Sequence, residues 1–168
     1  MKLIDGILQR VRNCKSYLDS GDAVKEHLAP KERQILSMQS DQLLEGKRPD
    51  GNDLRPYYSE DPYFTVYGNW GGDPDAYKAW KSTKPYWHNS KRNPDAPNLY
   101  INGKFHSELG CYFEADGILI TAATPYAMDI VAKYGNDSFG LSEERWAALM
   151  AEVLPDIVER LKQILNAR

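Results

Sequence analysis

The stretch that decides the fold is residues 109–122, which reads LGCYFEADGILITA. Apolar residues alternate with polar or small ones on both sides of Asp116-Gly117, and on the upstream side this alternation begins at Phe105. Asp-Gly favours a two-residue hairpin turn, because both central residues of that turn need positive φ. Pairing across the turn sets three apolar pairs on one face, so we predict an antiparallel hairpin. The expected pairs are Ala115 with Ile118, Phe113 with Ile120, and Cys111 with Ala122.

Helical patterns precede the hairpin. Residues 3–18 place apolar side chains at helical spacing, with Cys14 on the same stripe, and Ser20-Gly21-Asp22 ends the pattern. A second helix is expected over residues 23–44, bent or restarted at Pro30. Gly46 follows as the expected left-handed residue after that helix.

Helical patterns also follow the hairpin. Thr124-Pro125 is typical of an N-cap and first helical residue, and predicts a short helix that reaches Tyr134. Ser142 then precedes an apolar stripe that runs from Trp146 to Leu165. The stripe keeps its phase through Pro155, so we expect a bend there rather than a break. The predicted fold class is α+β, with the hairpin packed against N-terminal and C-terminal amphipathic helices.

Between these parts lies a segment without either period, over residues 46–97. It holds ten of the nineteen Phe, Tyr and Trp residues and seven of the ten prolines. Disordered linkers are poor in aromatic residues, so we expect an ordered insertion with one short helix near residues 75–80. The 168-residue chain is therefore divided into N-terminal helices (1–45), an irregular aromatic segment (46–97), and the hairpin with the C-terminal helices (98–168), all in one domain.

Composition and motifs exclude several function classes. The formal net charge is −3, and no apolar run is long enough to span a membrane, so binding to DNA by overall charge or to a membrane is not expected. Cys14 and Cys111 lack metal-ligand spacing, as do the three histidines. We predict no catalytic residue, no metal, no cofactor and no small-molecule ligand. The enzyme alternative is a hydrolase using the acids Asp50, Asp53, Glu60 and Asp61.

One local stretch, residues 76–94, carries five basic residues and no acidic one. Aromatic residues interleave with the basic ones, a pattern that suits a nucleic-acid backbone with stacking platforms, and a nucleic-acid-binding module is the second alternative. The interpretation without nucleic-acid binding is a solvated loop whose aromatic residues pack on their own domain or on a neighbouring subunit. The basic residues are Lys78, Lys81, Lys84, Lys91 and Arg92.

The order of several short motifs resembles tailed-bacteriophage virion morphogenesis and tail-completion proteins. Residues 48–56 (RPDGNDLRP) come first, then 102–109 (NGKFHSEL) and 118–121 (ILIT). The series continues with 124–127 (TPYA), 134–135 (YG) and 139–142 (FGLS), so the resemblance covers about residues 30–165.

The resemblance implies a non-enzymatic structural protein of the virion, made in the bacterial host cytoplasm, that forms a homo-oligomeric ring at the head–tail junction. Its partners would be other proteins of the portal, neck or tail, and the packaged DNA where the ring borders the channel. The five basic residues are the candidates to face that DNA. The candidate subunit-interface residues are Tyr57, Tyr58, Tyr63, Phe64, Tyr67, Trp70, Trp80 and Trp87.

Overall fold

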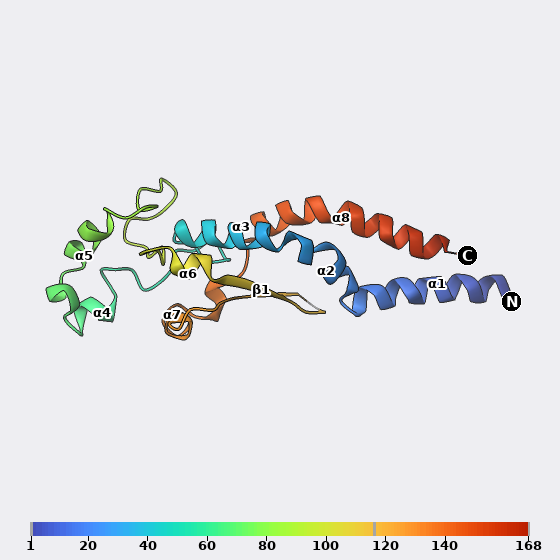
Figure 1. Cartoon of the computed structure of the whole chain (residues 1–168), viewed down its shortest axis with the longest axis horizontal. Coiled ribbons are helices and arrows are strands. Elements are labelled where there is room, and N and C mark those ends of the chain that lie inside the picture. Colours follow the sequence, from blue (N-terminus) through green and yellow to red (C-terminus); the bar gives the residue numbers. More distant parts are fainter. Residues whose placement is uncertain (1, 116, 168) are drawn as a thin grey trace.

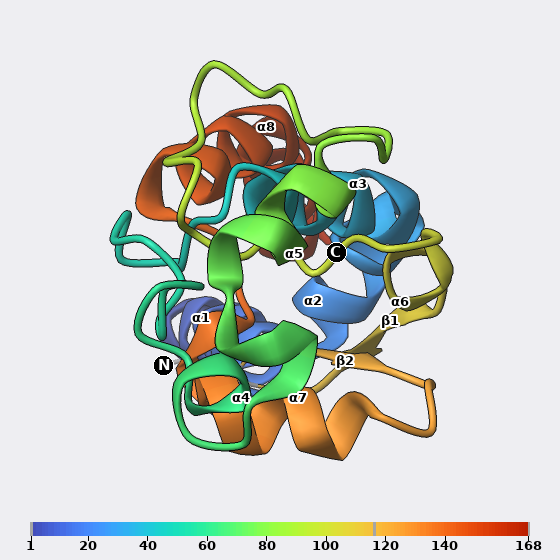
Figure 2. The same cartoon turned by 90° about the vertical axis from the view of Figure 1, so that its left-hand side faces the viewer.

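The computed structural model describes residues 2–115 and 117–167. The molecule is elongated (Figure 1). At one end, α1 (Lys2–Asp19) runs beside the C-terminal half of α8 (Glu143–Asn166), and we call this pair the stalk. At the other end, residues 57–98 form what we call the lobe, which contains α4 (Pro62–Thr65) and α5 (Pro74–Lys81) (Figures 1 and 2). The core lies between the stalk and the lobe.

The N-terminal helices follow the predicted pattern. α1 ends before Gly21, whose φ of 79° turns the chain into α2 (Asp22–His27). The turn η1 (Ala29–Lys31) contains Pro30 and restarts the chain as α3 (Glu32–Leu44). Gly46 has a φ of 67°, and its N–H donates to the Leu43 carbonyl while that of Lys47 donates to the Gln42 carbonyl. These two bonds form a Schellman motif, so the predicted helix end is confirmed.

The hairpin forms with one apolar face, but its predicted register is wrong by two residues. β1 (Leu109–Phe113) pairs with β2 (Ile118–Ala122) so that Phe113 faces Ile118 and Cys111 faces Ile120. The N–H of Glu114 donates to the Gly117 carbonyl at 2.9 Å, so the ladder closes before Ala115 and the turn is longer. Ala115 instead lies against Gly21: a Cβ added at Gly21 would be 2.5 Å from the Ala115 Cα. Because side chains alternate along a strand, a register shift of two residues keeps every side chain on its predicted face. Asp116, of the predicted turn, lies outside the described residues.

Two local predictions around the hairpin are wrong. The strand begins at Leu109 and not at Phe105, because Gly103 at a φ of 82° starts the helical turn α6 (Lys104–Ser107). The Asn102 side chain accepts from the Lys104 N–H at 3.1 Å, a local bond that favours this turn. Thr124 does not cap the next helix, α7 (Ala127–Tyr134), because its hydroxyl is buried without a partner among the described residues.

The C-terminal helix matches its prediction. After the turn η3 (Asn136–Ser138), the Ser142 hydroxyl accepts from the Arg145 N–H and caps α8. Pro155 lies inside α8, and Figure 1 shows the helix as continuous and curved.

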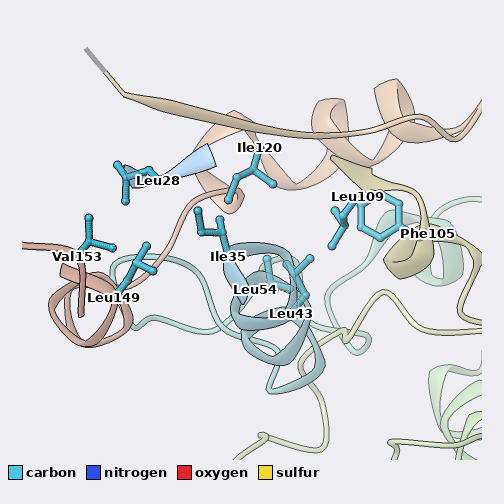
Figure 3. Packing of buried hydrophobic residues seen from close by; sticks show 9 residues of the cluster. All are labelled: Leu28, Ile35, Leu43, Leu54, Phe105, Leu109, Ile120, Leu149 and Val153. Atoms are coloured by element: carbon cyan, nitrogen blue, oxygen red, sulfur yellow. The ribbon is translucent and has the colours of Figure 1, made fainter. Parts of the chain in front are cut away.

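The core joins α3, the hairpin and the first half of α8 (Figure 3). Two fully buried amides attach the loop before α8 to α3: Gln39 accepts from the Gly140 N–H, and Gln42 accepts from the Ser142 N–H. The predicted α+β architecture is therefore confirmed. The buried apolar cluster consists of Leu28, Ile35, Leu43, Leu54, Phe105, Leu109, Ile120, Leu149 and Val153.

Candidate functional site: the lobe, its lysine pocket and the stalk

Two short helices with aspartate caps shape the lobe. α4 (Pro62–Thr65) follows Asp61, whose carboxylate accepts from the Tyr63 N–H at 3.0 Å. α5 (Pro74–Lys81) follows Asp73, whose carboxylate accepts from two N–H groups at 2.8 and 3.1 Å. In both cases a proline follows at the first helical position, where its missing N–H costs nothing. The turn η2 (Asn69–Gly72) joins the two helices. The helix predicted near residues 75–80 is confirmed as α5.

The aromatic residues of the lobe pack first on one another. The Tyr58 ring lies 5.3 Å from Tyr77, 6.3 Å from Trp87 and 6.5 Å from Phe64, measured between ring centroids. Tyr58 and Phe64 are buried, so their assignment to a subunit interface is wrong. Edge-to-face packing of rings needs no sequence period, which explains how an aperiodic segment builds its own small core.

Other members of the expected interface remain at the surface. Tyr63, Tyr67 and Trp70 are exposed, as is Val66, which an inventory of aromatic residues overlooks. Trp70 has a φ of 59°, an uncommon conformation for a bulky residue, between the left-handed Gly68 and Gly71. We call the exposed set the lobe face: Tyr63, Val66, Tyr67 and Trp70. Tyr57, Trp80 and Trp87 are half-buried.

The five basic residues do not form a common surface. Lys81 is 3% exposed and Arg92 is 6% exposed, so the expectation that these two face DNA is wrong. The Arg92 guanidinium is held by backbone carbonyls, including that of Ala96 at 2.6 Å, and it stacks on the Trp87 ring.

The other three basic residues are engaged at the lobe surface. Lys78 pairs with Asp75 at 2.7 Å and with Asp95 at 3.1 Å. Lys91 lies 3.4 Å from a Glu45 oxygen, and Lys84 lies over the Trp80 ring. Of the five basic residues, two are thus paired with acids of the chain, two are buried, and Lys84 lies on a ring.

A cavity of about 410 Å³ lies between the lobe and α7. Tyr58, Tyr77 and Lys81 line it from the lobe, and Ile130 and Tyr134 line it from α7. The Lys81 ammonium donates to the Tyr58 hydroxyl at 2.8 Å, its one hydrogen bond among the described residues. Burial, together with the nearby Arg92 charge, lowers the pKa of Lys81 to about 7. An amine with such a pKa gains and loses its proton close to neutral pH.

The tyrosines of this cavity resist ionisation. Burial raises the pKa of Tyr77 to about 12, and it raises the pKa of Tyr134 still more. The carboxylate of Asp61 is buried beside the cavity and pairs with Lys133.

Each of the four acids of the enzyme alternative is bonded to a different partner. Burial raises the pKa of Asp53, but hydrogen bonds from Lys47, Tyr57 and Asn93 hold it below the ordinary value. Glu60 pairs with Arg55 at 2.7 Å. The Asp50 side chain accepts from Asn52, in a local turn. These carboxylates therefore act as structural hydrogen-bond acceptors.

The stalk carries a second exposed apolar surface. Ile4, Ile7, Val11, Cys14 and Leu18 follow a heptad pattern along α1, yet four of the five are exposed and Cys14 is half-buried. The Cys14 thiol approaches the Leu161 carbonyl at 3.8 Å, which brings this stripe to the edge of α8. We call the exposed set the stalk face: Ile4, Ile7, Leu8, Val11 and Leu18 of α1, with Leu154, Val158 and Leu165 of α8.

Over residues 2–115 and 117–167, no cluster of His, Cys, Asp and Glu has the arrangement of a metal site. No helix in the same part of the chain is long and apolar enough to cross a membrane.

No family model, curated protein or solved structure matches this chain.

Proposed function

We propose that the chain is a non-enzymatic structural subunit of a tailed-phage virion, forming a ring at the head–tail junction with neighbouring portal, neck or tail proteins. The observation that carries the proposal is the pair of uncovered apolar surfaces, the stalk face and the lobe face, at opposite ends of one elongated molecule (Figure 1). Large exposed apolar patches mark interaction sites. A ring needs two different surfaces on each subunit, because each copy contacts two neighbours.

Two further observations support a structural role. The acids that would serve a hydrolase are bonded to separate structural partners. The nucleic-acid alternative is weakened because Lys81 and Arg92 are buried and because Lys78 and Lys91 already form ion pairs. Contact with packaged DNA remains part of the proposal only through the lobe surface around Lys84.

The test is deletion of the encoding gene from its phage. The expected result is an accumulation of filled heads and separate tails in electron micrographs, with joined virions restored by the wild-type gene. Mass spectrometry of purified wild-type virions should detect the chain in several copies per particle. Joined, infectious virions without the chain would refute the proposal.

A further inference from the structure

We propose that the stalk face of one copy docks on the lobe face of the next copy, a head-to-tail contact that rests on the proposed ring function. The two faces lie at opposite ends of the molecule, so they cannot cover one another within a single chain (Figure 1). A second copy of this chain offers each face the complementary surface it lacks.

The charges that accompany the two faces are complementary. Residues 6–18, which carry four of the eight residues of the stalk face, hold Arg10, Arg12 and Lys15 and no acidic residue. Residues 154–165, which carry three others, hold two acidic and two basic residues and add no net charge. Residues 60–77, which carry the lobe face, hold four acidic residues and no basic one. Charge complementarity steers association and suppresses contacts between two like faces. A stalk-to-stalk or lobe-to-lobe contact would instead bring like charges together.

Local ion pairs leave this complementarity available. Arg12 is exposed and forms no ion pair among the described residues, whereas Lys15 pairs with Asp19 at the end of α1. Glu60 and Asp75 pair with Arg55 and Lys78, yet the side chains of both acids stay 51% and 83% exposed. Acidic groups thus remain accessible beside the lobe face.

The side chains on the two faces also suit each other. Aliphatic residues at heptad positions of α1 form an apolar stripe of the kind that packs against a partner. The lobe face supplies three rings, and aromatic residues are the commonest energetic anchors of interfaces. Arg12 can stack on a ring face as well as pair with a carboxylate.

The lobe face also contains a residue in an uncommon backbone conformation. Trp70 is held in the left-handed conformation at this surface, and such strained residues cluster at binding sites.

Two double variants test the contact. Ile7→Glu with Val11→Glu disables the stalk face, and Val66→Glu with Tyr67→Glu disables the lobe face. The four side chains are about half exposed or more, so circular dichroism should show that both variants fold. The matched control is Leu119→Glu with Met128→Glu, because these two residues are equally exposed but belong to neither face.

Light scattering of the purified full chain gives the readout. The wild type and the control should form assemblies of several copies, and each face variant should have the mass of one chain. An equal mixture of the two variants should have the mass of two chains, because one intact stalk face then meets one intact lobe face.

Three outcomes would overturn the contact: a monomeric wild type at about 100 µM, assembly by either face variant alone, or a mixture that stays monomeric. These outcomes are separable from failure of the proposed function, which is scored by the presence of the chain in virions. A virion that contains the chain while the mixture stays monomeric refutes only the stalk-to-lobe contact.

Discussion

In the core, α3, the hairpin and α8 bury aliphatic side chains at regular sequence intervals. The lobe instead buries aromatic rings together with Lys81 and Arg92, from a segment with no period. Regular spacing lets a whole helix or strand face share one apolar layer. The lobe relies on aspartate caps, ring contacts and the carbonyl-bound guanidinium of Arg92, which are local and specific. The two regions should therefore respond differently to substitution.

The largest effect should come from a charge placed in the core. Val153 is 2% exposed, and Val153→Asp removes packing and buries an unpaired carboxylate, so the free energy of unfolding should fall by about 4 kcal/mol. Urea unfolding followed by circular dichroism measures the change. Val158→Asp, at a position 40% exposed on the same helix, should cost less than about 1 kcal/mol. Equal losses would contradict the assignment of Val153 to the core.

In the lobe, the buried lysine should make stability depend on pH. The pKa of Lys81 is about 7 in the folded chain and near 10.4 in an unfolded one. The unfolded state therefore binds more protons between these values, and the stability rises with pH across that window. The free energy of unfolding should increase by about 2 kcal/mol from pH 7 to pH 9, relative to Lys81→Met.

The matched control for this pH dependence is Lys84→Met, which removes a lysine at the lobe surface. It should keep the wild-type slope in urea titrations at each pH. If Lys81→Met also keeps that slope, the amine is not buried as described.

The junction between the two regions passes through Gly46. Its φ is 67°, and an added Cβ would lie 3.1 Å from both the Ala96 Cβ and the Pro97 carbonyl. Gly46→Ala should cost about 2 kcal/mol, from backbone strain plus this contact. Gly51→Ala is the control, since its φ is 81° but nothing lies within 4 Å of the added Cβ, and it should cost about 1 kcal/mol. A thermal unfolding series compares them, and identical losses would show that the contact is unimportant.

The smallest effect should come from a lobe cap. Asp73→Ala removes the acceptor for two N–H groups at the start of α5, which should cost about 1 kcal/mol. Hydrogen exchange should become faster in α5 while α3 stays protected. Asp75→Ala, in the first turn but without a capping bond, should change exchange much less. Uniform acceleration in both helices would mean that the lobe does not open separately.

The sequence predicts the periodic elements well and the aperiodic ones poorly. The α8 stripe, the Ser142 cap and the Gly46 helix end follow from local signals that the core reinforces. The predicted hairpin register is wrong because the Asp-Gly signal is local, whereas the structure also places Ala115 against Gly21, a neighbour distant in sequence. Alternation from Phe105 was overridden by the Asn102-Gly103 turn, which starts a helix.

The candidate site shows the same division. Counting aromatic and basic residues locates the lobe, but it cannot tell inward from outward side chains without a period. Tyr58, Phe64, Lys81 and Arg92 therefore lie inside although they were expected outside. The stalk face had a visible signal, the heptad of α1, but a heptad alone does not say whether the partner belongs to the same chain.

The distribution of the indole side chains has a spectroscopic consequence. Trp70, Trp80 and Trp87 lie in the lobe, and the fourth tryptophan, Trp146, begins α8. Intrinsic fluorescence therefore reports mainly on the lobe, whereas far-ultraviolet ellipticity arises mainly from the long helices of the core and stalk. Coincident transitions by the two probes would identify one cooperative unit, and separate transitions would identify the lobe as an independently melting part. Tryptophan fluorescence can therefore be used to follow the region that we assign to assembly.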